Sequence, residues 1–336
     1  MENLQQLLFT EIKARIRPNI SMVDEIASLL NISNDSAYRR IRGEKLITLE
    51  EIQKLAAHFK ISIDKILNLS SDTGTFSGKY ITADNFDFAK YLGQMTTDLE
   101  FINSFKQKEI IFFSKDIPSF HYFTYPELAA FKYFFWMKTI LQFSQFNNTP
   151  FSFDILLKTM IDDGMKVIKS YNVIPSVEIM SIENINTTLR QIEFYKETFQ
   201  FKQQEELNLI YDKLHEMTDH ICHQAETGKK FMPNQNHELL TGTYKLYVND
   251  FIIGDNSNIV TVDNNKLSFL VHSHINYIVV NDERLTSYQY AFIQNIIKKS
   301  ILISDVGEKY RTRFFHLIHD KIEQCREGRM QTIGKL

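Results

Sequence analysis

The chain has 336 residues with a net charge of −3, and 43% of its residues are hydrophobic. This length and composition predict two or three globular domains with substantial cores, and they exclude a globally basic protein that coats nucleic acid. Two cysteines, Cys222 and Cys325, are too few for a disulfide framework. We see neither a signal-peptide pattern at the start nor an apolar run of membrane-spanning length, so we expect a cytoplasmic protein without a membrane partner.

Residues 21–43 have the pattern of two short helices joined by a three-residue turn. Ser21 and Ser33 stand where the N-caps of the two helices are expected. Asn31 is among the few non-glycine residues that tolerate the left-handed backbone of such a turn, and Gly43 ends the second helix. A bihelical unit of this kind is a device for laying one helix in the DNA major groove.

The second helix of this unit carries most of the polar side chains. Ala37 and Ile41 are expected to face inward and the polar residues outward. An ordinary solvated, basic helix face is the alternative interpretation. The residues that we expect to contact DNA are Ser33, Asn34, Asp35, Ser36, Tyr38, Arg39, Arg40, Arg42 and Lys45.

Further helices are predicted on both sides of this unit. Residues 4–17 have apolar side chains in helical register. Thr48 and Glu51 form a capping-box pattern ahead of another helix, and a short helix is expected at residues 64–67. Together these elements predict an all-α, five-helix DNA-binding domain over residues 1–69.

The N-terminal segment resembles the helix-turn-helix of the Cro and phage-repressor-like family of bacterial regulators. The resemblance covers all five predicted helices and is carried by Ala27, Asn31, Ile32, Ser33, Ala37 and Gly43. It implies a DNA-binding helix-turn-helix domain.

The resemblance also implies roles for single residues. By position, Asn34, Asp35 and Arg39 would read bases, and Arg42 would face the DNA backbone. Two positions depart from the family pattern. Val23 stands where a glutamine often opens the first helix of the motif, and Arg40 stands at the family's second inward position.

The predicted DNA-binding domain is almost neutral. Residues 1–70 carry a net charge of +1 and the remainder of the chain carries −4. Affinity for DNA must therefore come from local placement of positive charge. Because one such module would bind weakly, we expect a homodimer on a palindromic operator in double-stranded DNA.

After a polar, glycine-punctuated linker at residues 70–79, residues 80–330 are predicted to form a larger α+β domain. We interpret it as helix-rich with an antiparallel sheet, and as the part that senses an effector and dimerises. Helices are expected near residues 88–102, 126–141, 153–170, 182–199, 205–226, 287–299 and 308–327. Strands are expected at residues 109–114, 120–124, 243–253, 259–263, 267–280 and 301–304.

Four residues are candidates for an effector site. Trp136 belongs to an aromatic cluster too broad for a single helical stripe. His272 and His274 share one face of a predicted strand. Arg311 lies one turn into a helix whose N-terminus could hold an anionic effector. Core packing, hydrogen-bonded histidines, and a helix cap with solvated charges are the default explanations of the same residues.

The sequence supports neither a metal site nor catalysis. His215, Asp219 and His223 follow each other at four-residue spacing, but over two turns they span about 12 Å and cannot share one ion. We therefore predict a polar helix face there and no cofactor. No glycine-rich phosphate loop, nucleophile elbow or zinc-ligand quartet is present, so we assign no catalytic residue.

The leading hypothesis is a sequence-specific transcriptional regulator, by default a repressor, controlled by an unknown small-molecule or peptide effector. One alternative is a peptide-sensing regulator built from helical repeats, which predicts almost pure helix beyond residue 80. The other is an enzyme with a helix-turn-helix module, which requires clustered acidic or metal-binding residues.

Overall fold

The structure is a computed structural model that describes residues 4–67, 76–78, 86–155, 158–233, 242–251, 256–273 and 275–329. Its internal contacts divide the chain into two compact units, residues 1–76 (unit 1) and 77–336 (unit 2). Within the described residues, no helix combines the length and the apolar composition that are needed to cross a bilayer.

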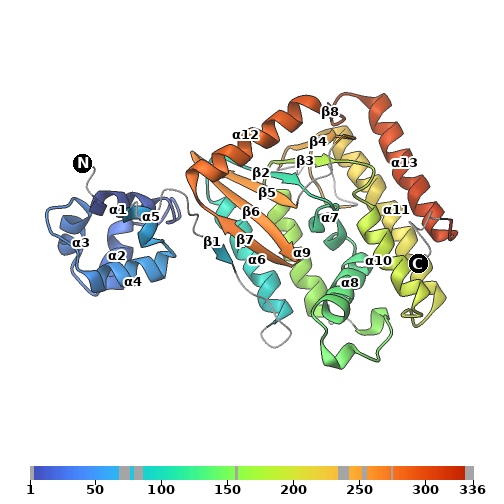
Figure 1. Cartoon of the computed structure of the whole chain (residues 1–336), viewed down its shortest axis with the longest axis horizontal. Helices are drawn as coiled ribbons and strands as arrows, with labels where there is room; N and C mark the ends of the chain where they lie inside the picture. The colour runs from blue at the N-terminus through green and yellow to red at the C-terminus, as the bar shows by residue number, and fades with distance from the viewer. Residues whose placement is uncertain are drawn as a thin grey trace. The chain divides into compact units, whose positions relative to one another are not determined.

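Unit 1 is a bundle of short helices (blue in Figure 1) around a small apolar core. Leu8, Ile12, Ile26, Ala37 and Leu55 are among the side chains buried in this core. All five predicted helices form, although the first ends at Lys13 rather than at residue 17. The helices are α1 (Leu4–Lys13), α2 (Met22–Leu30), α3 (Asn34–Ile41), α4 (Leu49–Phe59) and α5 (Ile63–Leu67).

Unit 2 is built on one eight-stranded sheet with the order β1-β7-β6-β5-β2-β3-β4-β8. The prediction of an antiparallel sheet is wrong at its centre, because β2 pairs in parallel with β3, and β3 with β4. Long helical connections precede β3 and β4 and return the chain in the same direction, as parallel pairing requires. The strands are β1 (Phe76–Gly78), β2 (Lys108–Phe113), β3 (Ser176–Met180), β4 (Tyr244–Val248), β5 (Ser257–Val262), β6 (Asn265–Ser273), β7 (Asn276–Val280) and β8 (Ile301–Leu302).

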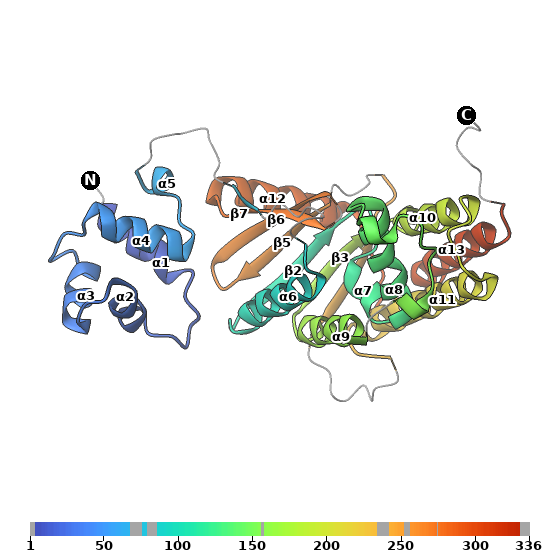
Figure 2. The same ribbon diagram turned by 90° about the horizontal axis from the view of Figure 1, so that it is seen from below.

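Helices cover both faces of this sheet (Figure 2). In β2, Ile111 and Phe113 pack on one face against Ile293 and Ile296 of α12. Ile110 belongs to the larger core on the other face, as the period-2 alternation of a strand requires. The helices are α6 (Phe88–Asn103), α7 (Ser119–Phe123), α8 (Pro126–Phe135), α9 (Lys158–Asn172), α10 (Asn186–Glu197), α11 (Gln204–Thr227), α12 (Glu283–Lys299) and α13 (Glu308–Arg326). A π-helical turn, Trp136–Ile140, continues α8, and the 3-10 turns Ser144–Phe146 and Phe153–Ile155 follow it.

Three other sequence predictions for unit 2 are wrong. Of residues 120–124, predicted as a strand, the first four lie in helix α7, which begins directly after Pro118, and Thr124 is the C-cap of that helix. Strand β3 was missed, and the helix predicted to start at residue 182 starts at Asn186. The single strand predicted over residues 267–280 is a hairpin of β6 and β7 with a register shift near Ser273.

A buried ion pair joins α3 to α4 in unit 1. The guanidinium group of Arg40 donates to both carboxylate oxygens of Glu51 at 3.0 and 2.7 Å, and to the carbonyl of Ser36 at 3.1 Å. This overturns the expectation that Arg40 points outward to DNA, because only 6% of its side chain is exposed. Glu51 also closes the capping box of α4 with Thr48, and the hydrogen bonds from Arg40 lower its pKa.

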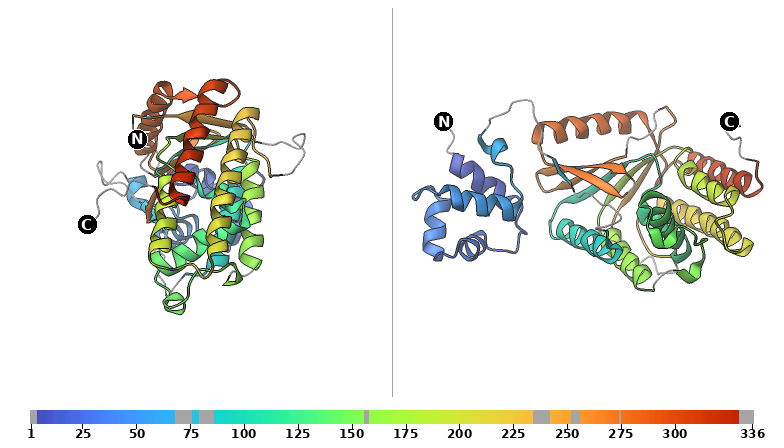
Figure 3. Two further views of the ribbon diagram at one scale, coloured as in Figure 1. Left: turned by 90° about the vertical axis from the view of Figure 1, so that its right-hand side faces the viewer. Right: turned by 60° about the horizontal axis from the view of Figure 1, so that its bottom comes forward.

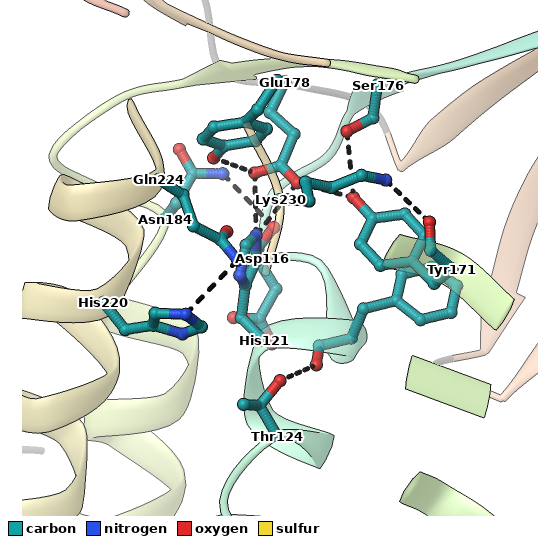
Figure 4. A network of polar contacts seen from close by, with 12 residues as sticks. Asp116, His121, Thr124, Tyr171, Ser176, Glu178, Asn184, His220, Gln224 and Lys230 are labelled. Atoms are coloured by element: carbon teal, nitrogen blue, oxygen red, sulfur yellow. Dashed lines mark hydrogen bonds and ion pairs between the residues drawn. The ribbon is translucent and has the colours of Figure 1, made fainter. Parts of the chain in front are cut away.

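The buried carboxylate of Glu178, in β3, is the centre of a polar network in unit 2 (Figure 4). Its two oxygens lie 2.9 and 3.0 Å from Nε2 of His121. They also accept hydrogen bonds from the hydroxyls of Tyr171 at 3.0 Å and Tyr244 at 2.8 Å. Burial would raise the pKa of Glu178, but His121 and the two hydroxyls outweigh it, so the pKa is lowered. The network thereby joins α7, α9, β3 and β4.

Two buried lysines have their ammonium groups enclosed by acceptors and aromatic rings. Lys230 donates to the carbonyl of Tyr171 at 2.8 Å and lies 3.5 Å from the centroid of that ring, and burial lowers its pKa well below the usual value. Lys132 of α8 reaches Thr188 at 2.6 Å and Gln191 at 3.0 Å, both in α10, and Asp116 at 3.2 Å. These contacts tie secondary-structure elements together, which is a structural role.

His220 of α11 borders the Glu178 network. Its Nε2 lies 3.4 Å from the amide nitrogen of Gln224, and its ring meets the edge of Phe231 at a centroid separation of 5.1 Å. Burial, followed by the nearby His121, lowers the pKa of His220 to about 4.

We predict that the Arg40→Met substitution destabilises unit 1 by about 2–4 kcal/mol, because it leaves the carboxylate of Glu51 half-buried and unpaired. Equilibrium denaturation with hydrogen exchange of unit 1 amides measures this loss. The matched control is Arg39→Met, whose side chain is 54% exposed and which should change stability by no more than about 0.5 kcal/mol. Equal effects of the two substitutions would contradict a specific role of the buried pair.

We also predict that acid weakens unit 2 partly through His220. Because its pKa is lower in the folded than in the unfolded chain, the unfolded state binds the proton first as the pH falls from about 6.5 to about 4. Stability is therefore present above this window and is lost on acidification through it. Thermal unfolding at several pH values should show a shallower loss in His220→Gln, whereas His316→Gln, an exposed control in α13, should follow the parent protein.

Candidate nucleic-acid interface

The turn between α2 and α3 has the geometry that its sequence predicts. Asn31 adopts the left-handed conformation at φ 54°, and the next residue, Ile32, packs against the apolar core. Ser33 then caps α3, its hydroxyl accepting a hydrogen bond from the backbone N–H of Ser36 at 3.3 Å. The three-residue turn therefore holds two helices, Met22–Leu30 and Asn34–Ile41, against each other.

The inward face of α3 consists of Ala37 and Arg40, both buried, with Ile41 half-buried beside them. Compared with the sequence prediction, α3 is rotated about its axis, so that Arg40 rather than Ile41 is the second buried residue after Ala37. The remaining members of the predicted DNA-contacting set are exposed or, for Ser36, half-buried: Ser33, Asn34, Asp35, Ser36, Tyr38, Arg39, Arg42 and Lys45.

The outward arginines of α3 are already engaged in weak surface contacts. Nη2 of Arg42 donates to the hydroxyl of Tyr38 at 3.0 Å, and the guanidinium lies 4.4 Å from the centroid of that ring. The carboxylate of Glu44 lies 3.6 Å from Arg42 and 3.9 Å from Arg39. The side chains of Arg39, Arg42 and Glu44 are each at least half exposed, so the ion pairs between them are weak. A phosphate or a base edge can replace Glu44 as the partner of either arginine.

Asn34 and the loop after α3 are held by contacts from other elements. The side-chain amide of Asn34 donates to Asp24 of α2 at 2.8 Å. From α1, the amide nitrogen of Gln5 donates to the carbonyls of Arg40 at 2.7 Å and Lys45 at 2.8 Å. The amide oxygen of Gln5 accepts from the backbone N–H of Ile47 at 3.2 Å. Gln5 was not predicted, because a glutamine in the first turn of a helix with several other polar residues has the pattern of an ordinary surface side chain.

Two of the four residues proposed for an effector site are committed to other contacts in the structure. Trp136 is buried in the core of unit 2, where it packs against Phe88 and Phe123. Arg311 is also buried, and its Nη1 donates to the carbonyl of Ile303 at 2.8 Å, so it anchors its own chain rather than an anion. The side chain of His272 and all of His274 lie outside the described residues.

The helix face with three spaced polar residues, His215, Asp219 and His223, is also divided. His215 and Asp219 both face α13, whereas His223 pairs with Glu226 of its own helix at 3.3 Å. In the part of the chain that the structure describes, no group of three or more His, Cys, Asp or Glu side chains is arranged to hold a metal ion.

Comparison with known proteins gives one match. No curated protein and no solved structure matches the chain. Residues 2–99, which cover unit 1 and continue into α6, match the BetR domain family. The BetR domain is a helix-turn-helix-like domain of regulators, so the N-terminal part of this chain is similar to a regulatory domain.

Proposed function

We propose that the chain is a sequence-specific, DNA-binding transcriptional regulator in which α3 enters the major groove of double-stranded DNA. The observation that carries this proposal is the outward face of α3, where Asn34, Arg39 and Arg42 stand on a capped helix anchored by the buried Arg40. The BetR match over residues 2–99 supports a regulatory role. A rigid helix with exposed Asn and Arg side chains suits the reading of base edges.

Within this interface we assign Asn34, Asp35 and Arg39 to base edges, and Arg42 and Lys45 to phosphates. Arginine can bind guanine and asparagine can bind adenine through two hydrogen bonds, while cations beside the helix hold the backbone. Arg40 is excluded from this set because its donors are committed to Glu51 and Ser36.

For unit 2 we propose effector sensing and dimerisation, with a homodimer on a palindromic operator and repression by occupancy in the cytoplasm. The near-neutral charge of residues 1–70 supports a dimer, because one module would gain little from counterion release. We propose no catalytic role, since the oxygens of Glu178 are committed to three buried partners.

The alternative of a helical-repeat peptide sensor is not compatible with the fold. It predicts almost pure helix beyond residue 80, whereas unit 2 contains an eight-stranded mixed sheet. A superhelical stack of helix pairs does not contain such a sheet.

The proposal is tested by selecting DNA fragments, including DNA upstream of the chain's own gene, and measuring binding of the full chain by fluorescence polarisation. We predict that Arg39→Ala loses about 1–3 kcal/mol of discrimination between the selected site and a mutated site. Arg42→Ala should weaken binding to both sites equally and reduce the salt slope by about one ion.

Lys13→Ala, which removes an exposed charge in the last turn of α1, is the control for both arginine variants and should bind like the parent protein. The register assigned to α3 is wrong if Arg39→Ala keeps full discrimination. The function itself is wrong if the full chain selects no DNA site above background.

The carboxylate beside the two arginines yields a prediction of opposite sign. Glu44→Gln should strengthen DNA binding about three- to tenfold at moderate salt, because it removes a competitor of phosphate for Arg39 and Arg42. The gain should shrink as salt rises. Glu11→Gln makes the same change of charge in α1 and should have a smaller effect; equal gains would point to net charge rather than to the position of Glu44.

A further inference from the structure

Two histidines from neighbouring helices of unit 2 meet head-on. Helices α11 and α13 lie side by side (Figure 3), and Nδ1 of His215 lies 2.5 Å from Nδ1 of His319. The ring planes are within 5° of parallel and the ring centroids are 4.8 Å apart. The centroid separation equals the Nδ1–Nδ1 distance plus one ring radius on each side. The two Nδ1 atoms therefore lie on the line between the ring centres. Because the ring planes are parallel, the two rings lie edge to edge in one plane rather than face to face.

The outer nitrogens of the two rings define where their protons are. Nε2 of His215 lies 2.7 Å from a carboxylate oxygen of Glu323, and Nε2 of His319 lies 3.0 Å from a carboxylate oxygen of Asp219. An ionised carboxylate only accepts hydrogen bonds, so both Nε2 atoms carry hydrogen. In the neutral rings both Nδ1 atoms then carry lone pairs, which point at each other. A positive charge between them removes this repulsion.

We propose that His215 and His319 form a binding site for a single proton, shared between their two Nδ1 atoms. The proton comes from solvent, which reaches the rings because 22% and 26% of the two side chains are exposed. In the occupied site, one imidazolium–imidazole pair lies between the carboxylates of Glu323 and Asp219. It bridges α11 and α13, so the packing of these helices should be strongest when the site holds one proton.

The geometry favours a proton over a metal ion. Nitrogen–metal bonds of about 2.0–2.1 Å would require the two facing nitrogens to stand farther apart. Glu323 and Asp219 lie at the outer Nε2 atoms, and among the described residues no group of three or more His, Cys, Asp or Glu side chains is arranged to hold a metal ion. A second proton is also disfavoured, because two imidazolium charges at this distance would repel each other; burial, the main cause, already lowers the pKa of His319.

Other charged groups surround the site without touching the shared nitrogens. Nη1 of Arg326 in α13 lies 3.8 Å from Glu323 and 2.8 Å from Asp212 of α11. The remaining charged neighbours form pairs of their own: His316 with Asp320, Lys213 with Glu216 near Glu127, and Lys321 with Glu183. None of these pairs places a carboxylate at Nδ1, so the two imidazoles depend on each other for the proton.

The test uses the full chain, stripped of metal by a chelator and labelled with nitrogen-15 at histidine. Nitrogen chemical shifts report which ring nitrogen carries hydrogen. We expect hydrogen on both Nε2 atoms throughout, and uptake of a single proton by the pair as the pH falls through the general range of histidine titration, from about 8 to about 5. In His319→Gln the nitrogen-shift signature of one proton shared between two Nδ1 atoms should be lost from His215.

Stability provides a second readout. At about pH 6, His215→Gln and His319→Gln should each lower Tm by about 2–4 °C, and the double variant should lose no more than either single variant. The loss should shrink as the pH rises, because the parent protein then gives up the proton. His223→Gln, an exposed substitution in the same helix, is the control and should leave Tm unchanged.

Three outcomes would overturn the proposal. The first is independent uptake of two protons by the two rings over this range. The second is hydrogen on Nδ1 of either neutral ring at high pH. The third is that Zn²⁺ raises the Tm of the parent protein, but of neither single variant, and displaces the shared proton. That result would make the pair a metal site.

Discussion

The ion pair between Arg40 and Glu51 determines which residues α3 can offer to DNA. α3 has only eight residues, so each residue that faces the core leaves one fewer side chain available to contact DNA. By turning Arg40 inward, the pair leaves Arg39 and Arg42 on the outer face at neighbouring positions. The same carboxylate caps α4, so the orientation of α3 and the start of α4 depend on one side chain. The proposed reading of DNA therefore depends on a contact that never touches DNA.

Much of unit 1 could be predicted from sequence because its signals are local. Ser33 as a cap, Asn31 in the left-handed turn and the Thr48–Glu51 capping box each act within four residues. The rotation of α3 could not be predicted from such local patterns; its one sign was the family resemblance, which puts Arg40 at the second inward position. Arg40 is buried only because Glu51, eleven residues later, offers two oxygens in the required geometry, and residue type alone indicates a solvated arginine.

Unit 2 shows where local patterns are insufficient. The aromatic run Phe120–Thr124 has strong strand propensity, yet it forms α7 because Tyr122, Phe123 and their neighbours find a core on several sides at once. Strand β3 contains Glu178, and a charged residue argues against a buried strand unless its partners His121, Tyr171 and Tyr244 are known. Similarly, the His215–His319 contact joins residues 104 positions apart, so spacing within α11 alone suggested only a polar surface.

The side chain of Gln5 has a practical consequence for handling this protein. Its amide connects the first turn of α1 to both ends of the loop that follows α3, through the carbonyls of Arg40 and Lys45 and the N–H of Ile47. An affinity tag or a truncation that unwinds the opening turn would release that loop, although every proposed DNA-reading side chain would remain intact. Purification handles therefore belong at the carboxyl end, in unit 2, which contributes no residue to this brace.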